Sequence, residues 1–142
     1  MKFNEFYSLT IVHSRDIILV KGVDYMNITK QKSQKTFDKQ AADYDTNIQG
    51  EHARKLYKPI IENLKNKNIH SILDLGCGTG ALLKEIKELN IAEQLFGIDI
   101  SPNMLEIAKN KLGNDATLIL GDSERLPFED SSFDAIVCND SF

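Results

Sequence analysis

The stretch Ile72-Leu73-Asp74-Leu75-Gly76-Cys77-Gly78-Thr79-Gly80-Ala81-Leu82-Leu83 combines three patterns. An apolar run that contains an acid is followed by three glycines at alternate positions, and an amphipathic pattern begins directly after them. This order predicts a strand, a tight turn and a helix. Glycine permits positive φ and, because it has no Cβ, it lets a ligand lie against the backbone. The first N–H groups of the helix have no intrahelical partner, so the turn is a candidate ligand site.

The acid before the glycines narrows the choice of ligand. The dinucleotide-binding pattern is G-x-G-x-x-G, with a pyrophosphate at the helix N-terminus. Here the spacing is G-x-G-x-G, and Asp74 lies two residues before the first glycine. A carboxylate at that place repels a pyrophosphate and suits a ligand with positive charge and no phosphate. S-adenosylmethionine, which has a sulfonium and an amino group, meets this description better than NAD does.

Length and composition exclude several classes of protein. A chain of 142 residues forms one domain at most, and its net charge of −4 with no basic stripe predicts no nucleic-acid partner. Cys77 and Cys138 fit neither a zinc nor a redox spacing, so we expect no metal and two small buried side chains. No apolar run is long enough to span a membrane, and a reducing cytoplasm is the predicted location.

Strand and helix patterns alternate after the glycine turn. Ser101-Pro102 is typical of a helix start, and Gly113 of a helix end. This alternation predicts an α/β fold with a Rossmann-like parallel sheet and right-handed crossovers. The three strands predicted after the turn are Leu95–Asp99, Thr117–Leu120 and Phe133–Asn139.

Acids end or directly follow three of the predicted strands. Because the carboxyl ends of parallel strands line one crevice, we expect Asp74, Asp99 and Asp122 to converge. Asp99 lies about 20 residues past the last glycine, where an acid accepts hydrogen bonds from ribose hydroxyls. Asp122 is placed to accept from an exocyclic amine, and Ile100 and Met104 are candidates for holding an adenine ring between them. Taken singly, each acid also fits an ordinary helix cap or turn.

Residues 1–25 form an uncertain N-terminal extension. Two short β-prone runs, Leu9–Val12 and Ile17–Val20, fit a hairpin. A second interpretation is that the segment is not normally translated and that Met26 is the natural start. The two interpretations remain open.

Residues 26–66 are predicted to form a helical region in front of the sheet. Phe37, Ala41 and Tyr44 lie at helical spacing. They belong either to a short surface helix or to a lid that brings Tyr44 near the ligand. An apolar stripe over residues 51–66 predicts a buried helix face, with a kink or restart at Pro59. That stripe comprises Ala53, Leu56, Tyr57, Ile60, Ile61 and Leu64.

Several stretches together resemble the class I S-adenosylmethionine-dependent methyltransferases of the broad type 11 group. The resemblance implies that the glycine turn holds the methionine part of the cofactor, that Asp99 holds the ribose and that Asp122 contacts adenine N6. The matching stretches are Phe37 to Asp45, Leu73 to Gly80, Gly97 to Ala108, Gly121 to Phe128 and Ser132 to Asn139. The predicted cofactor-binding residues are Tyr44, Asp74, Gly76, Cys77, Gly78, Gly80, Asp99, Ile100, Met104, Asp122, Ser123 and Asn139.

The end of the chain departs from the family pattern. The family's sheet has seven strands in the order 3-2-1-4-5-7-6, and this sequence contains only the first four. Residues 67–142 are therefore predicted to be the cofactor-binding half of a truncated or split gene product. The fourth strand is then expected to be an open apolar edge, which invites pairing with another chain.

Two functional hypotheses follow. The first is methyl transfer from S-adenosylmethionine, most simply to a small-molecule acceptor. The alternative is a non-catalytic cofactor-binding fragment that needs a partner chain to complete its sheet. No general base or other catalytic residue is identified, and Asn139 either orients the substrate or caps the strand end.

Overall fold

The computed structural model of the protein describes residues 9–13, 16–20, 30–46, 48–122 and 125–139. These residues form one sheet with the strand order β2-β1-β6-β3-β4-β5. The strands are β1 (Leu9–His13), β2 (Asp16–Val20), β3 (Ser71–Leu75), β4 (Gln94–Asp99), β5 (Ala116–Leu120) and β6 (Ala135–Asn139). The helices are α1 (Lys30–Gln40), α2 (Ile48–Lys55), α3 (Tyr57–Leu64), α4 (Ala81–Glu88), α5 (Pro102–Leu112) and the short 3-10 helix η1 (Gly113–Asp115).

Four of the strands form the predicted parallel sheet. β3 lies between β6 and β4, and β5 pairs with β4 on the outside. β3 is buried along its whole length, as a central parallel strand should be. Asp134 joins the starts of β3 and β6, because its Oδ2 accepts from the backbone N–H groups of His70 (2.8 Å) and Ser71 (3.1 Å). The predicted Rossmann-like α/β fold, with the first strand central, is confirmed.

The N-terminal hairpin changes the edge of this sheet. β1 and β2 pair antiparallel, as the sequence suggested, and β1 also pairs antiparallel with β6. The register runs from Leu9 opposite Asn139 to His13 opposite Ala135. The prediction that the fourth parallel strand is an open edge is therefore wrong, because β1 takes up the backbone hydrogen bonds on that side. The proposed natural start at Met26 lies outside the described residues.

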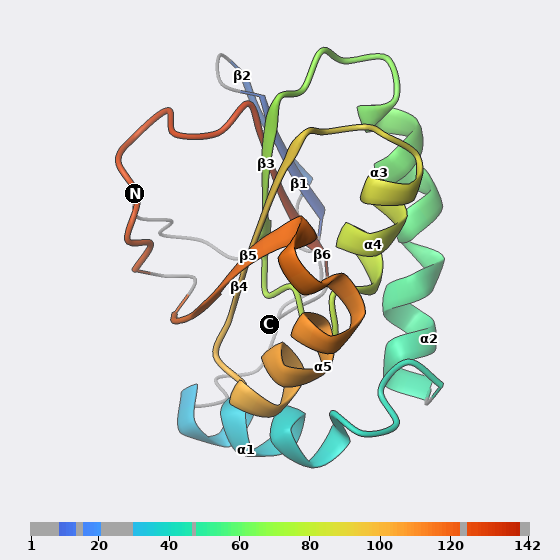
Figure 1. Ribbon diagram of the computed structural model, residues 1–142, viewed down its shortest axis with the longest axis vertical. Helices are drawn as coiled ribbons and strands as arrows, with labels where there is room; N and C mark the ends of the chain where they lie inside the picture. The colour runs from blue at the N-terminus through green and yellow to red at the C-terminus, as the bar shows by residue number, and fades with distance from the viewer. Residues whose placement is uncertain (1–8, 14–15, 21–29, 47, 123–124, 140–142) are drawn as a thin grey trace.

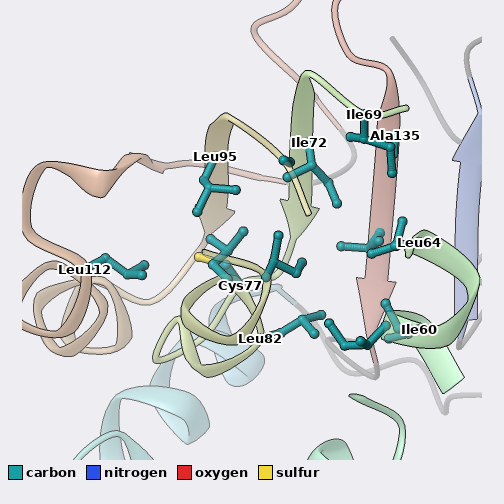
Figure 2. Close-up of a cluster of buried hydrophobic side chains, with 14 residues drawn as sticks. Ile60, Leu64, Ile69, Ile72, Cys77, Leu82, Leu95, Leu112 and Ala135 are labelled. Atoms are coloured by element: carbon teal, nitrogen blue, oxygen red, sulfur yellow. The ribbon is translucent and has the colours of Figure 1, made fainter. Parts of the chain in front are cut away.

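The two faces of the sheet are covered in different ways (Figure 1). Helices α3, α4 and α5 cover one face, where Ile60 and Leu64 of α3 pack against the strands (Figure 2). The segment between β5 and β6 covers the other face. There Phe133 makes edge-to-face contacts with Phe96 (centroids 5.1 Å apart) and Phe128 (4.8 Å). Both faces therefore bury the apolar side chains that the sheet presents to them.

The helices in front of the sheet follow the sequence prediction in part. α2 ends at Lys55 and α3 begins at Tyr57, so Pro59 lies in the first turn of a new helix, where proline is tolerated. The spacing of Phe37, Ala41 and Tyr44 predicted a helix through Tyr44, but α1 ends at Gln40. Turns replace it, with the N–H of Asp43 donating to the Gln40 carbonyl (3.2 Å). Among the helices that the structure describes, none combines the length and apolar character that crossing a membrane requires.

Candidate functional site

The glycine turn after β3 adopts a backbone that only glycine accommodates easily. φ is 68° at Gly76, 55° at Gly78 and 78° at Gly80. The backbone N–H groups of Gly76 and Cys77 both donate to the carbonyl of Ile98 (2.7 and 3.0 Å), which fixes the turn to β4. Sequence and structure therefore agree on the reason for the alternate glycines.

The turn has one open side and one packed side. A methyl group on Gly78 would meet no atom within 4 Å, so this glycine faces free space. A methyl group on Gly80 would lie 2.9 Å from Cδ1 of Leu112, since α4 begins directly against α5. The side chain of Cys77 points into the core toward Gly97, and burial first, then the charge of Asp74, raises the pKa of its thiol. A ligand on the open side would thus meet the backbone of Cys77 and not its sulfur.

Asp74 is a buried carboxyl with an unused oxygen. Its side chain is 2% exposed, and its Oδ1 has no hydrogen-bond partner among the described residues. Burial raises the pKa of Asp74 well above its ordinary value, and the negative charge of Asp99 adds to this effect. A buried unpaired carboxylate is costly, whereas a cation beside it would stabilise the charged form.

Asp99 connects the turn to the start of α5. Its Oδ2 accepts from the backbone N–H of Gly78 (2.8 Å), and its Oδ1 accepts from that of Ser101 (2.9 Å). Burial raises the pKa of Asp99, and these backbone hydrogen bonds oppose that rise. Because each carboxylate oxygen has two lone pairs, Asp99 retains capacity to accept from a ligand.

Asp122, which follows β5, and Asn139, which ends β6, lie at the same end of the parallel sheet as Asp99. The N–H of Gly121 donates to the carbonyl of Asp99 (2.9 Å), which brings Asp122 next to the end of β4. Asp122 is half-buried, and its carbonyl accepts from the N–H of Arg125 (3.0 Å). Ser123 lies outside the described residues. Asn139 is the last residue of β6 and pairs through its backbone with β1.

Ile100 and Met104 differ in their accessibility. Ile100 is half-buried at the end of β4, whereas Met104 is 1% exposed. The N–H of Met104 donates to Oγ of Ser101 (3.2 Å), and this is the helix cap that the Ser-Pro pair predicted. Ile100 therefore has surface available for a ligand, while Met104 is buried in the core.

The segment after α1 approaches the turn. Burial raises the pKa of the Tyr44 hydroxyl, and the charge of Asp99 raises it further. The ring of Phe37 makes an edge contact with that of Tyr44 (centroids 6.4 Å apart). Nη1 of Arg54 donates to the Tyr44 carbonyl (3.3 Å), and a Cβ on Gly50 would lie only 1.6 Å from that carbonyl oxygen. Helix α2 can come this close to Tyr44 only because it carries glycine there.

Residues 72–142, which make up half of the chain, match a family described as a methyltransferase domain. The chain belongs to this methyltransferase family. The predicted relationship to the class I enzymes that use S-adenosylmethionine is thereby confirmed, and the cofactor prediction is confirmed at the level of the family.

Curated relatives match a larger part of this methyltransferase chain. The chain is 36% identical over 111 residues to a demethylmenaquinone methyltransferase of Thermotoga maritima, a match that covers 76% of this chain and 48% of the relative. It is 35% identical over 118 residues to a malonyl-acyl-carrier-protein O-methyltransferase of Priestia megaterium, covering 81% of this chain and 42% of the relative. The chain therefore spans about half the length of these relatives.

Solved structures support the fold. The YcgJ protein of Bacillus subtilis is 27% identical with a TM-score of 0.52, and the match covers 60% of this chain and 37% of that one. The cyclase SpnF is 22% identical with a TM-score of 0.59, covering 75% of this chain and 47% of that one. At this identity SpnF shows the fold alone, and its name indicates that the fold is not restricted to one reaction.

The residues present fit the family's cofactor. The open space at Gly78, the unpaired oxygen of Asp74 and the spare acceptor capacity of Asp99 lie around one turn. Together they offer room, a partner for a positive charge and acceptors for hydroxyl groups. Nothing in this set favours a pyrophosphate, since both side chains are acids.

The structure also adds a residue that the sequence did not assign to the site. Tyr57 belongs to the apolar stripe of α3 and packs partly against the core. Burial first, and then the charge of Asp74, raise the pKa of its hydroxyl, so the phenol is electrostatically coupled to that acid. In sequence, Tyr57 occupies a position of the buried stripe like any core aromatic, so no local signal distinguishes it.

Proposed function

We propose that this chain binds S-adenosylmethionine on the open side of the glycine turn and serves methyl transfer to a small-molecule acceptor. The observation that carries the proposal is the buried carboxyl of Asp74, whose Oδ1 has no partner among the described residues. The amino group of the cofactor is a cation that would satisfy this oxygen. The open backbone at Gly78 gives the ligand room to approach it.

Each acid has a proposed role. Asp74 binds the amino group, Asp99 accepts from the ribose hydroxyls and Asp122 accepts from the adenine amine. Ile100 contacts the adenine ring, and Met104 supports that contact from the core. The remaining residues of the proposed site are Tyr44, Gly76, Cys77, Gly78, Gly80, Ser123 and Asn139.

The chain contributes binding, orientation and exclusion of water. When bound, S-adenosylmethionine supplies a methyl group that is already activated by its sulfonium leaving group. Asp74 and Asp99 then fix the two ends of the ligand, so that the methyl group has one direction of approach. Tyr44, which is half-buried and whose hydroxyl pKa is raised by burial and by the charge of Asp99, shields this region from water. No side chain is assigned as a general base.

The names of the relatives support a small-molecule acceptor. They specify demethylmenaquinone, a malonyl group on acyl-carrier protein and, in Caenorhabditis elegans, a sterol. The net charge of −4 offers no support for a nucleic-acid acceptor. We place the protein in the cytoplasm as part of the same proposal.

Calorimetric titration tests the cofactor site. We expect binding of S-adenosylmethionine and S-adenosylhomocysteine in roughly the micromolar range, and none of NAD. Asp99→Ala should weaken binding by about 1–3 kcal/mol, because it removes hydrogen bonds to the ribose. Asp115→Ala, at an exposed acid that follows α5, is the matched control and should bind like the wild type. A folded wild-type protein that binds neither compound would overturn the proposal.

The alternative function is a non-catalytic cofactor-binding fragment that requires a partner chain. The chain spans about half the length of the two relatives, so methyl transfer by this chain alone has to be measured directly. Assays with labelled S-adenosylmethionine and quinol or malonyl-thioester acceptors separate the two functions. Methyl transfer by this chain alone would exclude the fragment alternative, whereas tight cofactor binding without any transfer would support it.

A further inference from the structure

Lys111, Asp45 and Thr79 form a cluster that the cofactor site as described so far does not use. Nζ of Lys111 donates to Oδ2 of Asp45 (2.7 Å) and to Oγ1 of Thr79 (3.3 Å). Oγ1 of Thr79 in turn donates to Oδ1 of Asp45. The three residues come from the end of α5, from the segment after α1 and from the glycine turn. We call this cluster the Lys111 latch.

The latch is a charged contact in a partly buried place. The side chain of Lys111 is 18% exposed, whereas the lysine of the exposed Lys84–Glu88 pair is 51% exposed and its charges lie 3.8 Å apart. Burial by itself would raise the pKa of Asp45, but the hydrogen bonds from Lys111 and Thr79 outweigh it, so the pKa lies below its usual range. Asp45 is thus an anion at neutral pH, and charge-assisted hydrogen bonds of this kind are the stronger ones.

The latch reaches the cofactor site at two points. Thr79, which is 3% exposed, lies between the open Gly78 and the packed Gly80. Asp45 directly follows Tyr44, whose hydroxyl pKa is raised by burial and by the charge of Asp99. Lys111 therefore contacts both the residue that follows Tyr44 and a residue of the turn.

A second contact ties Asp38, near the end of α1, to the other end of α5. Oδ1 of Asp38 accepts from Oγ of Ser101 and from the N–H of Asn103 (3.3 Å). The side-chain amide of Asn103 donates to the Asp38 carbonyl (3.3 Å). Asp38 therefore contacts the start of α5, and Asp45 contacts Lys111 near its end.

We propose that Lys111 is a positioning residue of the cofactor site, which acts through Asp45 and Thr79 to hold Tyr44 over the ligand and slow its release. This inference rests on the proposed function. It goes beyond that function by assigning a role to a residue that does not touch the ligand.

The test compares Lys111→Met with Lys111→Arg and with Lys109→Met, an exposed lysine on the same helix. The dissociation rate of labelled S-adenosylhomocysteine is measured by a chase with unlabelled ligand. We expect Lys111→Met to raise this rate about tenfold, Lys111→Arg to restore most of the wild-type rate, and Lys109→Met to have no effect. The double variant with Asp45→Asn should be no faster than either single variant, because both remove the same contact.

Hydrogen exchange provides a readout that needs no ligand. In the free protein, Lys111→Met should speed amide exchange in residues 41–46 and leave α4 unchanged. If Lys111→Met does not fold, Asp45→Asn, at a carboxylate that is 42% exposed, takes its place. Unchanged exchange together with unchanged ligand dissociation would overturn the latch while leaving the proposed function intact. Faster exchange in Lys111→Met, together with a folded wild-type protein that binds no cofactor, would overturn the proposed function and show the contact without a ligand to hold.

Discussion

Gly78 and Gly80 lie two residues apart in the same turn, and both have positive φ, but they face different parts of the molecule. A methyl group on Gly78 would meet nothing within 4 Å, whereas one on Gly80 would lie 2.9 Å from Leu112 and 3.1 Å from Ala108. One glycine keeps a space open, and the other permits two helices to pack closely. The same motif therefore meets two physical requirements, and a stability measurement and a ligand measurement should separate them.

The largest expected effect is on the packed side. Gly80→Val places a branched side chain at a φ of 78° and against α5, so we expect the free energy of unfolding to fall by about 3 kcal/mol or more. Gly113→Val is the matched control, since Gly113 has a φ of 55° and open space around it. Its cost should be limited to the backbone strain, roughly 1–2 kcal/mol. Equal losses for the two variants in urea unfolding would contradict the packing argument.

A substitution at Gly78, on the open side of the turn, should affect ligand binding more than stability. Gly78→Ala and Gly113→Ala both place a side chain at a φ of 55° in open space, so each variant should lose about 1 kcal/mol of stability. Only Gly78→Ala should weaken binding of S-adenosylmethionine, by about tenfold or more, because its methyl group fills the ligand space. Calorimetry on both variants tests this. Equal affinities would show that the ligand does not lie at Gly78.

The pH dependence of Asp74 gives a further comparison. Its pKa is raised in the folded protein, so its contribution to stability is fully present below the ordinary aspartate pKa of about 4 and is lost as the pH rises through the raised value. Asp74→Asn should remove this loss, and the variant should gain stability relative to the wild type as the pH increases. Urea unfolding between pH 4 and pH 8 measures the difference.

Cofactor affinity should rise with pH because of Asp74, whereas the contribution of Asp74 to stability falls. Binding of a cation favours the charged form of Asp74, so the affinity of the wild type should rise with pH and level off once the acid is ionised. Asp74→Asn should bind about tenfold more weakly at neutral pH and should lack that rise. If Asp74→Asn loses affinity but its affinity still rises with pH, the rise comes from the titration of another group.

The smallest expected effect concerns Cys77, which lies between the glycines in sequence but belongs to the packed side. Its thiol is buried toward Gly97, so Cys77→Ala should cost about 1 kcal/mol of stability. Cofactor affinity should remain within roughly twofold of the wild type, since only the backbone faces the open side. A large loss of affinity in a stable variant would place the sulfur against the ligand.

Much of the fold was predictable because its signals are local. The alternate glycines predicted positive φ, and Ser101 and Gly113 cap α5 at the expected ends. Pro59 lies at a helix restart, where the sequence predicted a kink or restart. Each of these features depends on steric limits or hydrogen bonds within a few residues, so the residue types alone carry the information.

Other features depend on partners far away in the chain. Helical spacing extended to Tyr44, but the chain leaves the helix after Gln40, and Asp45 reaches Thr79 and Lys111 instead. Those partners lie 34 and 66 residues away. The pairing of β1 with β6 is of the same kind, because nothing in the β1 sequence specifies which strand edge it joins.

The sequence by itself determined the glycine turn, the acids after the strands and the family to which the chain belongs. Local backbone sterics and the alternation of strands and helices are sufficient for these, because they depend on the order of neighbouring residues. Only the tertiary structure decided which edge the hairpin covers, which glycine faces open space and which tyrosines approach Asp74 and Asp99. These features depend on packing between segments that are far apart in the chain. The same packing buries the acids and so raises the free energy of their charged forms.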